Sequence, residues 1–90
     1  MAKAVVDPED LRKFAVDLRR FGSEVQEHLA RINLQFAKVG ETWQDQEHAK
    51  FAQEFQLMVR VLSKFIASTE HQAPLLLRKA ESIRAYLDQR

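Results

Sequence analysis

Residues 40–48, GETWQDQEH, decide the fold of this chain. They hold Trp43, the only tryptophan, a short distance after Gly40, in a sequence that otherwise favours helix. Glycine and proline are the strongest signals for turns and loops, and the chain has only two of each. The sequence therefore predicts an all-α protein with one turn near its middle and a helix on each side.

The first helix is predicted over residues 8–39. Asp7 can accept hydrogen bonds from the first free amides, Pro8 suits the first helical position, and Asp10 lies in the positive first turn. Gly40 follows the helix at the position where a left-handed C-cap is common. The apolar residues recur at spacings of three and four, the period of one helix face: Leu11, Phe14, Leu18, Phe21, Val25, Leu29, Ile32, Phe36 and Val39.

The second helix is predicted over residues 43–73. Thr42 as the N-cap and Asp45 three residues later form a capping box, in which each side chain covers a free amide of the other. Trp43 then stands on the first helical turn. The apolar residues of this helix again have spacings of a single helix face: Phe51, Phe55, Met58, Leu62, Phe65 and Ile66.

Pro74 predicts a kink or break near residues 71–75, because a proline inside a helix removes a backbone hydrogen bond and costs about 3 kcal/mol. A helix over 8–39 is about 48 Å long, so an antiparallel helix that starts at residue 43 draws level with its start near Pro74. A C-terminal helical segment, 75–89, is predicted from Leu76, Ala80, Ile83 and Leu87. This segment is expected to pack against a second chain or, as the alternative, to fold back as a third helix.

The chain is expected to form a single helical-hairpin domain, residues 1–90, that needs a partner. An antiparallel pair of helices buries only one seam, but Ala15 and Gly22 widen the apolar stripe of the first helix beyond such a seam. A chain of this length is marginal alone, and without cysteine it gains no disulfide. We therefore expect two hairpins to assemble as a four-helix-bundle dimer, with the apolar stripes as core and interface.

Composition argues against several partners and locations. The net charge is +1 with acidic and basic residues interspersed, whereas nucleic-acid-binding proteins concentrate Lys and Arg on one face, so no nucleic-acid partner is expected. No apolar run reaches the roughly 18 residues of a membrane span. The N-terminal residues MAKAVVDPED lack the apolar segment of a signal peptide. The expected location is the cytoplasm, or outside the cell after export without a cleaved signal peptide.

Two pairs of a carboxylate and a histidine are the main candidates for chemistry. Asp45 and His48 share a helix face, and so do Glu24 and His28. A carboxylate-bridged metal site in a helical bundle needs Glu-x-x-His from two helices and two further glutamates, a pattern that the chain does not contain. Neither a cysteine nucleophile nor a phosphate-binding glycine loop is present. We expect no catalytic residue, no metal and no cofactor; a metal-dependent four-helix-bundle enzyme is an alternative that rests on these four residues.

A 90-residue chain with two long amphipathic helices and a lone tryptophan in the turn resembles the WXG family, the small early-secreted-antigen-like helical hairpins associated with type VII secretion. The resemblance extends over VDPEDLRKFAVDLRRF, over VGETWQDQEHAKFAQEF and along the second helix. It implies an antiparallel dimer with another copy or with a paralogous hairpin, export without a cleaved signal, and a secretion motor ATPase as a further partner. It also implies that Trp43, beside Gly40, Thr42 and Asp45, helps to form a recognition feature in the turn.

The chain departs from the family pattern at two points. Asp45 stands where the motif has glycine, giving W-x-D, and the predicted capping box accounts for an aspartate there. The family's export signal, a tyrosine followed four residues later by an acid, is not reproduced, because the fourth residue after Tyr86 is Arg90. The leading prediction is a dimeric interaction protein that acts as a substrate, partner or adaptor of a specialised secretion system. The alternative is an intracellular scaffold or regulatory subunit of the same fold that is never exported.

Overall fold

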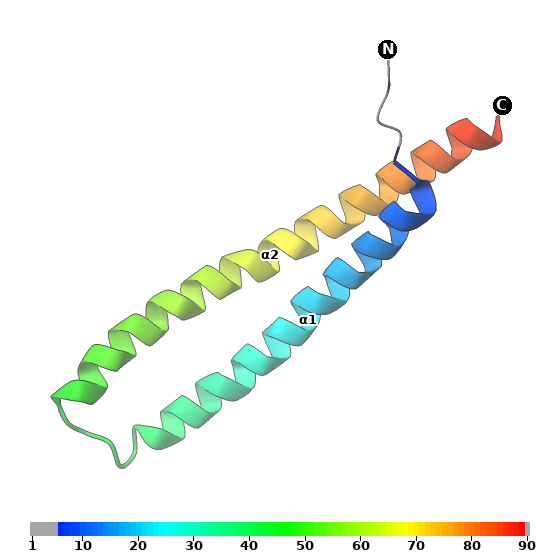
Figure 1. Cartoon of the computed structure of the whole chain (residues 1–90). Coiled ribbons are helices and arrows are strands. Elements are labelled where there is room, and N and C mark those ends of the chain that lie inside the picture. The colour runs from blue at the N-terminus through cyan, green and yellow to red at the C-terminus, as the bar shows by residue number, and fades with distance from the viewer. Residues whose placement is uncertain (1–5, 90) are drawn as a thin grey trace.

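The computed structural model describes residues 6–89, which form two long antiparallel helices (Figure 1). α1, Pro8–Val39, and α2, Gln46–Asp88, are joined by the connection 40–45. Together they make an extended rod of 67 × 25 × 15 Å. The all-α helical hairpin predicted from the sequence is confirmed. Arg90, which occupies the position of the family's export acid, lies outside the described residues.

α1 begins where its sequence signals predict. The Asp7 carboxylate accepts hydrogen bonds from the amides of Glu9 at 2.8 Å and Asp10 at 3.4 Å, and Pro8 is the first helical residue. These bonds satisfy amides that have no partner within the helix. Glu9 and Asp10 also place negative charge near the positive end of the helix.

α2 begins three residues later than predicted, and its N-cap is Asp45 rather than Thr42. The Asp45 carboxylate accepts a hydrogen bond from the amide of His48 at 3.0 Å. The Thr42 hydroxyl instead donates to the carbonyl of Val39 at 3.4 Å, within the connection. The predicted capping box is wrong because aspartate and threonine are both good N-caps, and the local sequence does not decide between them. Trp43 therefore lies in the connection and not on the first turn of α2.

α2 continues through Pro74, so the predicted break does not occur; the segment after Pro74 is helical as predicted, but as the continuation of α2 (Figure 1). The proline has no N–H to donate to the carbonyl of Glu70. Ala73 and Ala80, which precede and follow it, are buried, with 0% and 3% of their surface exposed. Packing against α1 on both sides of Pro74 outweighs the missing hydrogen bond.

The two helices are staggered by about two and a half to three helical turns relative to the predicted pairing. Gly22 lies against Thr69, and the Glu9 carboxylate is 3.3 Å from the Arg84 guanidinium. The start of α1 is therefore level with Arg84 rather than with Pro74, and only the end of α2 extends past it (Figure 1). Ala80 is buried and Arg84 contacts Glu9, so the segment after Pro74 packs in part on its own hairpin, and the alternative of a third helix is wrong. The prediction assumed that α2 starts beside the last residue of α1, whereas the connection lets it start beyond that point.

One exposed ion pair, between Glu9 and Arg84, joins the helices at the open end of the hairpin, and a second lies within α1. Arg12 donates to the Glu9 carboxylate at 2.7 Å, and Arg84 donates to the same carboxylate at 3.3 Å. The hydrogen bond from Arg12 lowers the pKa of Glu9 below its ordinary value. Because all three side chains remain exposed, these pairs contribute little to the stability of the hairpin.

The seam between the helices changes character along its length. Toward the open end the helices approach closely, and a Cβ at Gly22 would collide with the Oγ1 of Thr69. That buried hydroxyl is satisfied by donating to the carbonyl of Ile66 at 2.8 Å. Toward the turn the seam is aromatic, with the ring centroids of Phe36 and Phe55 at 4.7 Å. The small buried residues of the seam are Ala15, Gly22, Thr69, Ala73 and Ala80.

Gly22→Ala is expected to lower the free energy of unfolding by about 1–3 kcal/mol, the usual cost of overpacking. This loss should occur although alanine favours helix over glycine by about 1 kcal/mol. Urea denaturation followed by circular dichroism measures it, with the neighbouring exposed Ser23→Ala as a near-neutral control. Adding Thr69→Ala to Gly22→Ala should restore part of the loss. A Gly22→Ala variant more stable than the parent would disprove the close approach.

Candidate interaction surface

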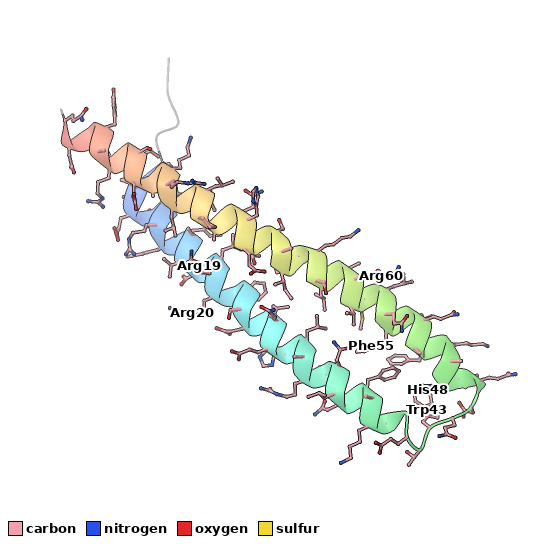
Figure 2. All side chains as sticks on the ribbon, turned by 180° about the vertical axis from the view of Figure 1, so that it is seen from behind. Arg19, Arg20, Trp43, His48, Phe55 and Arg60 are labelled. Carbon is pink, nitrogen blue, oxygen red and sulfur yellow. The ribbon has the colours of Figure 1, made fainter. Side chains whose placement is uncertain are left out.

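Five rings form an aromatic cluster at the turn end of the hairpin: Phe36, Trp43, His48, Phe51 and Phe55. Figure 2 labels Trp43, His48 and Phe55. Trp43 meets His48 edge-on, with ring centroids 5.0 Å apart, and lies 6.2 Å from Phe51. Phe36 stacks on His48 at 5.2 Å. The half-buried indole thus covers the end of the seam from the connection, while part of its surface stays accessible.

The role of Gly40 is to leave space for the ring of His48, not to adopt a left-handed backbone conformation. Its φ of −64° is ordinary right-handed helical geometry, so a left-handed C-cap does not form. A Cβ at this position would lie 3.3 Å from the Nε2 of His48, which is buried and has no hydrogen-bond partner within residues 6–89. His48 has little freedom to withdraw, because it is held between Phe36 and Trp43. The absence of a side chain at Gly40 therefore lets the chain pass close to the imidazole ring.

The W-x-D sequence places its aspartate at the start of a helix. Asp45 has φ −107° and ψ −176°, an extended conformation that any L-residue adopts. Glycine would also serve here, because it ranks with threonine among the preferred N-cap residues. The third position of the tryptophan motif is thus a helix N-cap in this chain. It needs no left-handed backbone.

One face of the hairpin exposes large apolar side chains from both helices. Phe21 is 54% exposed, and its ring meets that of Phe65 edge-on at 5.7 Å, so both helices contribute to this face. Among the residues predicted as core or interface, Phe55 is buried, and six are half-buried: Leu11, Leu18, Val25, Leu29, Phe36 and Leu62. The exposed members of that set, termed the apolar face, are Phe14, Phe21, Ile32, Phe51, Met58 and Phe65.

An open apolar groove of about 390 Å³ lies on the same face, on the turn side of the Phe21–Phe65 pair. Its lining is almost wholly apolar and comes from both helices: Val25, His28, Leu29, Ile32, Phe55, Met58, Val59 and Leu62. A contiguous exposed apolar surface of this kind is typical of a site that another protein covers. Opposite it, the surface beside Gly22 is lined by the polar side chains Arg19, Ser23, Gln26 and Glu70 together with the apolar Ile66.

Sequence spacing alone did not separate the seam from the apolar face. Thr69 and Ala73 are buried in the seam, although the predicted core contained neither. A seven-residue column does mark the seam on α1, since residues one heptad apart lie on one line of a helix. Its members are Ala15, Gly22, Leu29 and Phe36.

The two pairs of a carboxylate and a histidine do not come together. Asp45 caps α2 and His48 belongs to the aromatic cluster, whereas Glu24 and His28 are exposed on α1. Across residues 6–89, no three His, Cys, Asp or Glu side chains gather in the manner of metal ligands. In the same range, neither helix has a stretch apolar and long enough to span a membrane.

A protein-family model matches most of the chain. The model of the family WXG100, described as proteins of 100 residues with WXG, matches residues 4–87. This is a family of non-enzymatic helical hairpins associated with type VII secretion. Neither a curated protein nor a solved structure matches the chain.

Asp45→Ala is expected to lower the free energy of unfolding by about 0.5–2 kcal/mol, because the amide of His48 loses its acceptor. Asp45→Gly should cost only about a few tenths of a kcal/mol, since glycine is itself a good N-cap. Thr42→Ala, a control in the connection, should change stability by less than about 0.5 kcal/mol. Chemical denaturation of the three variants measures their free energies of unfolding and so gives the order of their stabilities. If Thr42→Ala lowered the free energy of unfolding more than Asp45→Ala, Thr42 and not Asp45 would be the N-cap.

Proposed function

We propose that this chain, which belongs to the WXG100 family, acts as a dimeric helical-hairpin interaction protein of a type VII secretion system. The family model covers residues 4–87, so the membership suspected from the hairpin and its turn tryptophan is confirmed. The family consists of small helical proteins that are secreted without a signal peptide. The proposal adds the partners: a second hairpin that covers the apolar face, and a secretion motor ATPase that contacts the assembled pair.

The apolar face is the observation that supports a second hairpin. Phe14, Phe21 and Met58 are each more than half exposed in the isolated chain. Full burial of one such side chain is worth about 1.5–3 kcal/mol relative to exposure. Two hairpins packed face to face would enclose these side chains as inner residues of a four-helix bundle. Such a partner accounts for large apolar residues that lie outside the seam.

The turn supports a recognition role at the end of the same surface. Phe51 belongs both to the apolar face and to the aromatic cluster around Trp43, so the two surfaces are continuous. The Asp45 N-cap leaves Trp43 outside the helix, with part of its indole accessible. A partner that covers the apolar face would therefore reach the tryptophan without any rearrangement of the turn.

Light scattering at micromolar concentration is expected to give a dimer, about twice the chain mass of 10.5 kDa. Phe21→Asp should shift the protein to a monomer, because the new carboxylate would be buried in the interface without a partner. Since Phe21 lies outside the seam, the variant should keep its helical circular dichroism.

Leu34→Asp is the matched control for this experiment. Leu34 is 74% exposed on α1, two residues along from Ile32 and therefore on nearly the opposite side of the helix. Its replacement should leave the dimer intact. A wild-type monomer with a cooperative melt, or equal effects of the two substitutions, would contradict the proposed dimer.

In the native host, the chain is expected in the culture medium only when the motor ATPase of the secretion system is present. Immunoblots of medium and cells from parent and ATPase-deletion strains measure this, with a cytoplasmic enzyme as the control for lysis. Retention in the cells of both strains would favour the non-exported scaffold of the same fold. That outcome would leave the dimer unaffected.

A further inference from the structure

A second groove lies on the face opposite the apolar face, beside the contact between Gly22 and Thr69. Its volume is about 340 Å³. Gly22 and Ile66, both buried, form its floor, so the base of the groove is apolar. Its rim consists of exposed polar side chains from both helices and is termed the Arg19–Glu70 groove. The rim residues are Arg19, Ser23 and Gln26 of α1 and Glu70 of α2.

The rim carries two opposite charges that are not neutralised. Within residues 6–89, neither Arg19 nor Glu70 forms an ion pair, with each other or with another side chain. On a helix, the positions three and four residues away are the ones that can supply a partner. These positions hold only alanine, valine, glycine and serine around Arg19, and only isoleucine, alanine and proline around Glu70. A guanidinium and a carboxylate thus border one groove, and each is available to an opposite charge from outside the chain.

Pro74 adds another acceptor to the α2 side of this groove. In an uninterrupted helix the amide of residue 74 would donate to the carbonyl of Glu70, but proline has no N–H. Because α2 continues through this position, the carbonyl of Glu70 lacks that donor. Glu70 therefore offers two kinds of acceptor, its carboxylate and its main-chain carbonyl. An ammonium group, which has three donors and no acceptor, can satisfy both kinds.

We propose that the Arg19–Glu70 groove binds a small zwitterion whose carboxylate contacts Arg19 and whose ammonium contacts Glu70. The guanidinium of Arg19 presents its donors as a planar fork that matches the two oxygens of a carboxylate. The apolar floor between the two charges fits a ligand with methylene groups between its own charges. Sites for small molecules commonly combine an apolar lining with a few polar groups that fix the orientation of the ligand.

The close contact of the helices holds the two sides of the groove in place. Gly22 lies against Thr69, one turn along α1 from Arg19 and directly before Glu70 on α2. A ligand would therefore meet two charges on rigid helices rather than on mobile loops, which lowers the entropy cost of binding. The groove lies on the face opposite the apolar face, so it stays open when a second hairpin covers the latter. The inference goes beyond the proposed function and does not depend on the dimer.

Titration of the ¹⁵N-labelled full chain with ε-aminocaproate, followed by NMR, tests the proposal. This probe is an aliphatic chain with a carboxylate at one end and an ammonium at the other. We expect saturable shifts of amide signals within residues 19–26 and 66–74, with a dissociation constant in roughly the millimolar range. Hexanoate and hexylamine, which each keep one of the two charges, should bind roughly tenfold more weakly because one charged contact is lost. Free lysine and Nα-acetyllysine in the same titration distinguish a free amino acid from a C-terminal lysine of a peptide.

Arg19→Gln and Glu70→Gln should each weaken the binding of ε-aminocaproate roughly tenfold, to the level of the probes with one charge. Arg20→Gln is the matched control, because this neighbouring arginine does not line the groove and has Asp17 at 3.8 Å. Pro74→Ala restores an amide donor to the carbonyl of Glu70. It should weaken binding severalfold while it raises the melting temperature, since alanine favours helix and proline does not.

Binding of ε-aminocaproate no tighter than that of hexanoate or hexylamine would overturn the proposal, and so would shifts that lie outside the groove. Wild-type affinity in the Arg19→Gln or Glu70→Gln variant would overturn it as well. Because both side chains are exposed, these variants should keep their helices, which circular dichroism verifies. Each of these results concerns the groove alone, whereas a monomer in light scattering would contradict the proposed dimer alone.

Discussion

The close approach of α1 and α2 at Gly22 and Thr69 determines where the large side chains of this protein lie. Beside Gly22 the seam accepts alanine but has no room for phenylalanine, and Phe14 and Phe21 lie outside it. Large apolar residues that would form the core of a more widely spaced helix pair lie instead on the apolar face. The isolated hairpin therefore has a thin core, and much of the hydrophobic free energy in its sequence is gained only when that surface is covered.

The turn divides two tasks between neighbouring residues. Trp43 closes the aromatic end of the seam from outside the helix, and Asp45 begins α2. Aspartate starts a helix by accepting a hydrogen bond from an amide, whereas glycine leaves the first amides open to water. Either residue can therefore follow the tryptophan at this distance. The chain has aspartate in place of the glycine of W-x-G, but it keeps a tryptophan followed two residues later by the N-cap of a helix.

The hairpin could be predicted from the sequence because its signals are local and agree with one another. The Asp7–Pro8 start, the apolar spacings and the glycine before the tryptophan all indicate two helices and one turn. The start of α2 could not be fixed, because Thr42 and Asp45 are equally plausible N-caps and only the path of the connection distinguishes them.

The continuity at Pro74 and the register of the helices also depended on information that lies far away in the sequence. Burial of Ala73 and Ala80 against α1 decides both, and no local rule supplies it. The apolar stripe likewise showed which residues avoid water but not which of them face the other helix. For the candidate surface, the sequence supplied the residues, and the structure divided them between the seam and the apolar face.

The two ends of the seam differ in the length of chain that separates their contacting residues. Phe36 and His48 are joined through the short connection, whereas Glu9 and Arg84 are 75 residues apart. Closing a long loop costs more entropy than closing a short one, so folding favours the aromatic end first and the open end last.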